Sequence, residues 1–315
     1  VLFGRREAVA EARGFTSSAQ CRECHAEVYA EWQQSWHARS WTDPDVRAPS
    51  QSNNFANKDC IDCHAPKDVF LTGIGKRVLP RSTRRSEGVD CLACHRLPDG
   101  RMAGTLTDDR AACRPLATLD LQREDFCGVC HNQHKTVDQW RATQWAERGE
   151  GCIFCHMPFR DGDPNRGRSH RMLGGHDLPL LQSAVSLTAE RQGDKVVVVL
   201  ENHGAGHAYP TDERSRASDL WWRPQGEQDW RHLHRIRDPY RYETDIPSTL
   251  LMPGERRRIE LVDADASGAL EVMLVYKLTP YYRDPLTGAA QFTAEVTDPL
   301  SDSREVYRVQ VEAGQ

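Results

Sequence analysis

The stretch Cys91-Leu-Ala-Cys94-His95 decides the fold of this chain, because its pattern of two cysteines separated by two residues and followed by a histidine occurs five times. The other copies are Cys21-Arg-Glu-Cys24-His25, Cys60-Ile-Asp-Cys63-His64, Cys127-Gly-Val-Cys130-His131 and Cys152-Ile-Phe-Cys155-His156. At this composition chance would give about 0.02 copies. Two thiols at this spacing can bond the two vinyl groups of one haem, and the adjacent histidine can coordinate its iron from the same face. The motifs therefore predict five covalent c-type haems, attached through these ten cysteines, with the five motif histidines as iron ligands.

Other uses of paired cysteines fit the pattern poorly. A zinc ribbon pairs two Cys-x-x-Cys units around one ion, and a thioredoxin-like site has a single unit. Neither accounts for five copies that are each followed by histidine, and a disulfide framework does not require the histidine. The eleventh cysteine, Cys113, has no motif partner and is interpreted as a lone thiol.

The cellular location follows from the same motifs. Covalent haem attachment takes place outside the cytoplasm, so we expect an exported protein, periplasmic or extracellular. The chain starts at Val1 without a signal-peptide pattern, as a mature exported product would. The longest aliphatic run, Val196 to Leu200, is far shorter than the roughly 20 residues that a bilayer requires, so no membrane span is expected. With 41 basic and 46 acidic residues and a net charge of −5, nothing indicates a nucleic-acid partner.

Residues 1–180 contain all five motifs. Their first cysteines are separated by 39, 31, 36 and 25 positions, which leaves room for little more than a short helix and a loop per haem. Because so little chain cannot build an ordinary apolar core, the haems must pack against one another as the core. We expect a mostly α-helical and irregular pentahaem cytochrome domain over 1–180. Within it, the helical spacing of Val28, Trp32 and Trp36 predicts one helix between His25 and Ser40.

Residues 181–315 have no cysteine and show the alternation of apolar and polar residues that is typical of strands. The expected strands cover 184–190, 195–200, 259–262, 270–278, 292–296 and 305–311, and the first two form a hairpin. Several short strands separated by turns favour an antiparallel β-sandwich over 181–315. The fold class is therefore α+β multidomain, a pentahaem c-type cytochrome domain followed by a β-sandwich.

Arginine dominates the basic residues, since only six of the 41 are lysines. Arginine forms bidentate pairs with carboxylates, so several arginines are expected to pair with haem propionates. The cluster of Lys76, Arg77, Arg81, Arg84 and Arg85 leaves two interpretations open, a docking surface for an acidic redox partner or a solvated loop.

Residues around the motifs resemble a known family. Glu31-Trp32-x-x-Ser35-x-His37, Glu87-Gly88-Val89-Asp90 before Cys91, and Met157-Pro158 after His156 resemble the multihaem cytochromes c related to the tetrahaem cytochrome of ammonia oxidisers. His170-Arg-Met-Leu-Gly-Gly-His176-Asp177 and Asn202-His-Gly-Ala-Gly-His207-Ala-Tyr-Pro-Thr211 resemble motifs found where such haem domains precede a β-sandwich, although Asp212 replaces the usual glycine. The resemblance implies electron carriers, filament-forming extracellular cytochromes, or enzymes such as hydroxylamine oxidoreductase and pentahaem nitrite reductase.

The choice among these depends on the sixth iron ligands. The chain has eight histidines outside the motifs, and five would make every haem bis-histidine, which leaves no position for a substrate. The resemblance implies His37, His170, His176 and His207, and the position of His134 within the haem-rich stretch adds a fifth. The loop around His207, rich in small residues, predicts that the β-domain supplies this ligand to a haem of the first domain or of a neighbouring chain. His203, His232 and His234 are interpreted as histidines of the sandwich.

Three function classes follow. The supply of histidines favours the first, a periplasmic or extracellular electron carrier that passes electrons along five haems to redox partner proteins, other multihaem cytochromes or its own copies. The second is a reductase or oxidase of a small nitrogen or sulfur oxyanion at one open haem. The third is a partner- or surface-binding module wired by haems. The chain lacks the Cys-x-x-Cys-Lys motif of pentahaem nitrite reductase.

Overall fold

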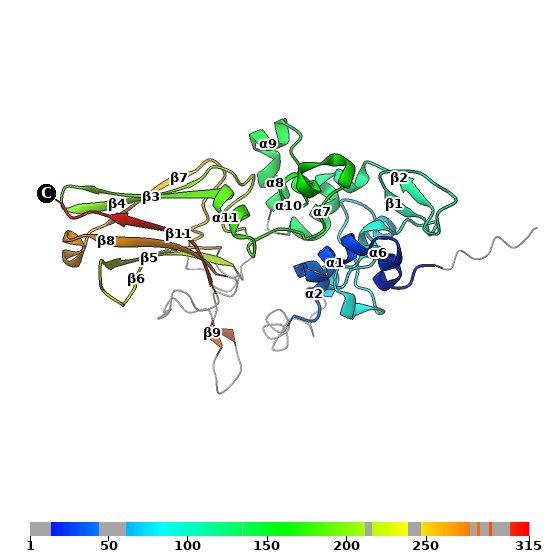
Figure 1. The fold of residues 1–315 in the computed structure, drawn as a ribbon, viewed down its shortest axis with the longest axis horizontal. Helices are drawn as coiled ribbons and strands as arrows, with labels where there is room; N and C mark the ends of the chain where they lie inside the picture. Colours follow the sequence, from blue (N-terminus) through cyan, green and yellow to red (C-terminus); the bar gives the residue numbers. More distant parts are fainter. Residues whose placement is uncertain are drawn as a thin grey trace, which may run out of the picture. The chain divides into compact units, whose positions relative to one another are not determined.

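The computed structural model describes residues 14–43, 61–133, 135–211, 216–238, 247–277, 282–283, 290–291 and 303–314. Cys60, His134 and the strand expected over 292–296 lie outside the described residues. The chain divides into two compact units. The first comprises Val1–Cys130 and Gly151–Met172, and the second comprises His131–Glu150 and Leu173–Gln315. The mixture of helix and sheet that the sequence predicts is confirmed (Figure 1).

The regular structure of the first unit consists mainly of short helices. They are η1 (Ser18–Glu23), α1 (Ala26–Gln34), α2 (Trp36–Arg39), α4 (Ile61–His64), α5 (Val69–Thr72), η2 (Arg85–Glu87), α6 (Cys91–His95), η3 (Asp120–Gln122), α7 (Glu124–His131, which runs into the second unit), α10 (Cys152–His156), η4 (Arg160–Gly162) and η5 (Pro164–Arg166). Two three-residue strands, β1 (Met102–Gly104) and β2 (Pro115–Ala117), pair in parallel. The apolar cluster of this unit is small, with Val69, Val78, Phe126 and Val129 as its buried members.

The helix predicted between His25 and Ser40 is broken at Ser35, so that prediction is wrong in its continuity. Ser35 has extended backbone angles, φ −76° and ψ 159°, between α1 and α2. Its hydroxyl donates to the Trp32 carbonyl at 2.6 Å and accepts from the Ala38 amide at 3.3 Å. A serine side chain that caps a helix start competes with helix continuation. His37 therefore lies on a separate helix and not on a continuation of α1.

Two antiparallel sheets form the frame of the second unit (Figure 1). The three-stranded sheet has the order β3 (Val185–Gln192), β4 (Lys195–Asn202), β7 (Arg256–Leu261). The four-stranded sheet has the order β11 (Ser303–Val311), β8 (Leu270–Lys277), β5 (Ala217–Pro224), β6 (Arg231–Ile236). The smaller elements are the pair β9 (Tyr282–Arg283) and β10 (Ala290–Gln291), η6 (Ala264–Ser267), and the helices α8 (Thr136–Arg141), α9 (Gln144–Glu147) and α11 (Leu178–Ala184). The predicted hairpin is confirmed as β3 and β4.

Strands β5 and β6 were missed by the sequence prediction. The first six residues of β5 are all buried, so the expected alternation is absent. Leu220 and Trp222 belong to the main core, whereas Trp221 packs with Met273 and Val275 in a second cluster. A strand that is buried on both faces has a continuous run of apolar residues. Its periodicity therefore does not distinguish it from a segment of a buried helix.

One apolar core is shared by both sheets. Leu187, Val198 and Leu200 from the first sheet cluster with residues such as Leu220 and Leu274 from the second. A fully buried side chain of this size contributes about 1.5–3 kcal/mol. In the part of the chain that the structure describes, the apolar core of this unit is thus much larger than the cluster of the first unit. Among the described residues, no helix is long and apolar enough to cross a membrane.

Candidate haem-attachment and iron-ligand sites

The motif cysteines and histidines that the structure describes lie on or beside single helical turns. Cys21 and Cys24 lie in and at the end of η1, and His25 is the residue before α1. The remaining described motifs lie on α4, α6, α7 and α10, each of which ends at its motif histidine. Residues three apart on a helix share a face, so both thiols of a motif point the same way. This is the arrangement that two thioether bonds to one haem require.

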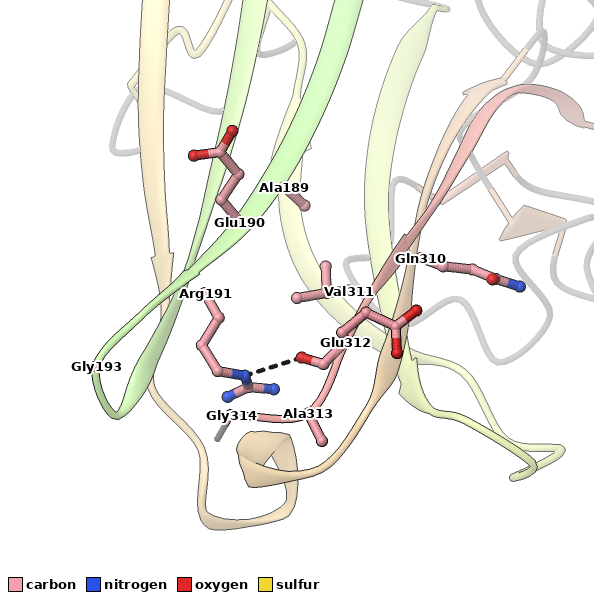
Figure 2. Close-up of a pocket in the computed structure, with 9 residues that line it drawn as sticks. All are labelled: Ala189, Glu190, Arg191, Gly193, Gln310, Val311, Glu312, Ala313 and Gly314. Atoms are coloured by element: carbon pink, nitrogen blue, oxygen red, sulfur yellow. Dashed lines mark hydrogen bonds between the residues drawn. The ribbon is translucent and has the colours of Figure 1, made fainter.

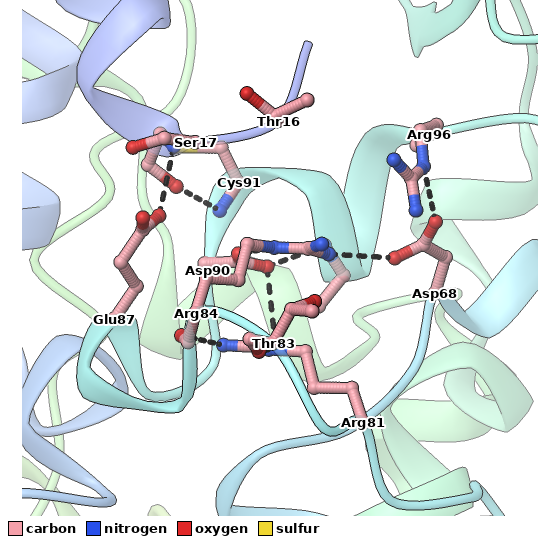
Figure 3. A network of polar contacts seen from close by, with 12 residues as sticks. Thr16, Ser17, Asp68, Arg81, Thr83, Arg84, Glu87, Asp90, Cys91 and Arg96 are labelled. Atoms are coloured by element: carbon pink, nitrogen blue, oxygen red, sulfur yellow. Dashed lines mark hydrogen bonds and ion pairs between the residues drawn. The ribbon is translucent and has the colours of Figure 1, made fainter. Parts of the chain in front are cut away.

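A buried ion-pair network holds the third motif (Figure 3). The Asp90 carboxylate caps α6 by accepting from the Ala93 amide at 2.8 Å and is itself fully buried. It pairs with Arg81 and Arg84, and Arg84 also pairs with Asp68. Burial raises the pKa of Asp90, and the two guanidiniums only partly offset this. The Asp68 carboxylate also forms an ion pair with Arg96, which directly follows the third motif.

Two members of the basic cluster, Arg81 and Arg84, belong to this buried network, whereas the Arg77 side chain is exposed. Arg81 is only 4% exposed, so it is neither a solvated loop residue nor part of a docking surface. It donates to the carbonyls of Pro66, Thr83, Arg84 and Gly88, which lie on both sides of the loop that leads to α6. The sequence carried no signal for these carbonyl partners, because main-chain groups are the same at every residue.

The first motif is joined to the third within this unit. The Cys91 amide donates to the Ser18 hydroxyl of η1 at 3.1 Å, and the Ser18 amide donates to the Glu87 carboxylate at 2.8 Å. The Cys21 thiol lies within hydrogen-bonding distance of the Cys91 thiol. The first cysteines of two motifs that are 70 residues apart in the chain therefore meet.

Two more pairs of thiols meet in the same way. Cys127 lies beside Cys152, which brings together the fourth and fifth motifs, and Cys63 lies beside Cys130, which brings together the second and fourth. The second cysteines of the second, third and fourth motifs, Cys63, Cys94 and Cys130, also pack against one apolar cluster. All five motifs are thus connected, but not in the order of the sequence.

Four of the predicted iron ligands share one hydrogen-bonding arrangement. The Nδ1 atom contacts a main-chain carbonyl in His64 (Ser40, 2.7 Å), His95 (Ala103, 2.8 Å), His170 (Arg168, 3.0 Å) and His207 (Ala208, 2.9 Å). A carbonyl oxygen can only accept, so Nδ1 carries the proton and Nε2 the lone pair. Metal-binding histidines are usually oriented by such a bond. The residues present therefore fit a metal ligand role at Nε2.

The rings of His95 and His170 face each other with their centroids 6.1 Å apart. Two histidines on opposite sides of one metal ion, each at about 2 Å, have ring centroids about 6 Å apart. Burial lowers the pKa of His170 to about 4, with the neighbouring His95 as a further cause, and burial also lowers the pKa of His95. Both rings are thus neutral at pH 7, which is the form that binds metals. Of the predicted sixth ligands, His170 is therefore the one whose ring lies beside the histidine of the third motif.

His37 lies where the second and third motifs approach each other. Its carbonyl accepts from the Val89 amide at 2.8 Å and from the Ser40 hydroxyl at 2.8 Å. The same hydroxyl donates to the His64 carbonyl at 2.9 Å. Ser40 thus ties the short helix of His37 to α4 and, through its own carbonyl, orients the His64 ring.

His176 and His207 lie in the second unit. The loop of His207 packs on α8, where the Ala208 amide donates to the Gln139 side chain at 2.9 Å. A Cβ on Gly206 would lie 2.9 Å from Trp140 Cδ1, so only glycine permits this approach. The loop of His176 is pressed against β8, where a Cβ on Gly175 would lie 2.7 Å from Tyr276 Cζ. Small residues thus hold both loops close to their supports.

The second unit also contains a pocket of about 470 Å³ beside the end of β11 (Figure 2). It is lined by Ala189, Glu190, Arg191, Gly193 and residues 310–314. Arg191 crosses it and donates to the Glu312 carbonyl at 3.1 Å. Its lining includes no cysteine or histidine, so it belongs to none of the predicted haem sites.

Comparison with known proteins gives one family match and one similar fold. Residues 20–96, which include the first three motifs, match the family model of cytochrome c554 and c-prime. The structure is similar to that of a penta-heme cytochrome c552 from Thermochromatium tepidum, with a TM-score of 0.65 and 20% identity over 95% of this chain and 99% of that chain. A superoxide reductase from Nanoarchaeum equitans matches 30% of this chain and 80% of that one at 17% identity, but its TM-score of 0.19 is too low to indicate a shared fold. No curated protein matches the chain. The family match and the shared fold support a multihaem c-type cytochrome.

Proposed function

We propose that the chain is an exported electron-transfer protein that carries five covalent c-type haems. The haem domain spans residues 1–180, and the two sheets that share one core form a β-sandwich domain over 181–315. The ten motif cysteines attach the haems, and the motif histidines coordinate the irons. His37, His134, His170, His176 and His207 supply the sixth ligands. The location is periplasmic or extracellular, and the partners are redox proteins, other multihaem cytochromes or further copies of this chain.

The opposed rings of His95 and His170 carry this proposal. A haem supplies one-electron chemistry at its iron. Both imidazoles carry their proton on Nδ1 and lie with ring centroids 6.1 Å apart, so their Nε2 atoms would be available to hold one iron and close it to other ligands. A centre closed in this way exchanges electrons but offers no site to a substrate, which separates a carrier from an oxyanion reductase.

The paired thiols support a continuous path. They place the first motif beside the third, and the second and fifth beside the fourth. The shared cluster of Cys63, Cys94 and Cys130 connects the third motif to this second group. The proposed order is therefore first, third, then the second and fourth, with the fifth reached through the fourth.

Electronic and paramagnetic spectra of the oxidised protein test the proposal. We expect five low-spin haems and no change when nitrite, cyanide or hydroxylamine is added at moderate concentration. A high-spin haem that binds one of these ligands would favour the reductase or oxidase instead.

A further inference from the structure

A loop that carries His170 is tied to α1 by two carboxylates one helical turn apart. Arg160, which begins η4, donates to both oxygens of Glu31, from Nε at 2.9 Å and from a terminal nitrogen at 2.8 Å. The same carboxylate accepts from the His170 amide at 2.7 Å. One turn earlier, Glu27 accepts from Arg166 at 2.9 Å. Glu31 thus has three donors, whereas Glu27 has no contact with His170 among the interactions of the described residues.

The ion pairs of the two carboxylates differ in burial. The side chains of Glu31 and Arg160 are 17% and 9% exposed, whereas those of Glu27 and Arg166 are 60% and 46% exposed. An exposed pair contributes little to stability, because solvent and salt screen the two charges. A shielded bidentate pair is geometrically specific, and removing one partner leaves the other charge poorly solvated. Only the inner pair can therefore fix the position of the chain at His170.

A second set of hydrogen bonds, made by Arg168, also fixes the loop that carries His170. Arg168 donates to the carbonyls of Ile153 and Met157, in and just after the fifth motif, at 3.1 and 3.0 Å. Its own carbonyl accepts the proton of His170 Nδ1 at 3.0 Å. The His170 ring is therefore oriented from one side through Arg168, and its main chain is held from the other side through Glu31.

We propose that Glu31, held by Arg160, is a positioning residue that keeps His170 at the sixth coordination position opposite His95. This inference rests on the proposed function, because it requires the third-motif iron between the two rings. Outer partners of metal ligands commonly change metal affinity about 10- to 100-fold when they are removed. Without the acceptor at its amide, His170 would lose one of the two constraints that hold its ring in place.

The test compares E31A with E27A in the haem-loaded protein. Both variants remove one negative charge from the same face of α1, but only E31A removes the acceptor of the His170 amide. We expect E31A to show a high-spin signal from one haem in five and cyanide binding at that haem at least about tenfold tighter than in the wild type. E27A should match the wild type. E31Q keeps an oxygen acceptor and should recover most of the low-spin signal.

Two further variants separate positioning from general stability. E31A/R160A leaves no unpaired charge and should still give the high-spin signal if E31A alone folds poorly. E31R/R160E keeps an ion pair but turns a donor toward the His170 amide, so it should not restore the low-spin state. Spectra of E31A and E31A/R160A identical to that of E27A would overturn the inference. H170A distinguishes its failure from that of the proposed function, because an unchanged H170A spectrum would overturn the His95 and His170 pair itself.

Discussion

The main-chain oxygen of His37 lies directly against Gly88, so closely that a Cβ at this glycine would overlap it. The same Cβ would lie 2.7 Å from the Ala38 carbonyl. Gly88 has φ +59°, a backbone conformation that side chains disfavour. The clash and the positive φ both require glycine at this position, where α2 lies against the residues that precede the third motif.

The stability cost of substituting Gly88 measures how much this close contact constrains the residue. We expect G88A to cost about 3 kcal/mol or more, because the clash adds to the strain of the positive φ. G100A is the matched control, since Gly100 has φ +82° and no atom within 4 Å of its Cβ position. It should cost only about 1 kcal/mol. The two costs are compared by hydrogen exchange at α6, and equal values would contradict the role of the close contact.

The haem content follows from the motifs. The mature protein should carry five covalent haems per chain that resist acid extraction, and a C91S/C94S variant should retain four. Mass spectrometry of the intact chain gives the number directly. Four or fewer haems in fully matured wild-type protein would show that a motif is not used.

Removal of His170 should open one iron. H170A is expected to convert one haem in five to high spin, because the ring that faces His95 is lost. Added imidazole should restore the low-spin spectrum by occupying the same position. H203A is the control, since His203 is not a predicted ligand. A low-spin H170A protein would place the sixth ligand elsewhere.

His207 is expected to be an iron ligand as well. H207A should produce one high-spin haem, because the bond from Nδ1 to the Ala208 carbonyl places the lone pair on Nε2, the form that binds a metal. The loop itself should stay in place, since Gln139 holds it through the Ala208 amide. A H207A spectrum that matches the wild type would make His207 a residue of the β-domain alone.

A buried cross-strand pair controls the acid stability of the second unit. Asp219 on β5 is fully buried and accepts two bonds from Arg235 of β6, at 2.7 and 2.8 Å. Burial would raise the pKa of Asp219, but Arg235 and His232 outweigh this and hold the pKa below its ordinary value of 3.8. D219N should cost about 3 kcal/mol at pH 7, because it leaves the guanidinium without its counter-charge.

The pH dependence of this cost follows from the direction of the pKa shift. A carboxylate with a lowered pKa stabilises the fold above pH 3.8 and loses this contribution as the pH falls through its folded-state pKa. The difference between wild type and D219N, measured by hydrogen exchange at β5 and β6, should therefore shrink below pH 3.8. A difference that is constant down to pH 2 would contradict the pairing.

Local sequence patterns predict the haem chemistry and account for the mixture of helix and sheet. Five copies of one spaced motif predict the attachment cysteines and proximal histidines, since haem attachment depends on local spacing alone. Alternation along β3 and β11 likewise predicts these strands, because a half-buried strand shows its two faces in the order of its residues. Strands β4 and β8 are mostly buried, and their apolar runs predict them instead. Local patterns fail where distant residues bury both faces of a strand, as at β5. They also fail where a single side chain ends a helix by capping the next one, as at Ser35.

Tertiary packing, and not local sequence, determines which motifs and side chains lie close together. The contact of Cys21 with Cys91, the facing rings of His95 and His170 and the bond from His170 to Glu31 join residues that are 70, 75 and 139 positions apart. No periodicity connects such residues, because their proximity results from packing and from main-chain carbonyls that every residue possesses. For the same reason the eight histidines outside the motifs look alike in the sequence, whereas the structure sets His170 apart by the carbonyl against its Nδ1 and by the His95 ring near it.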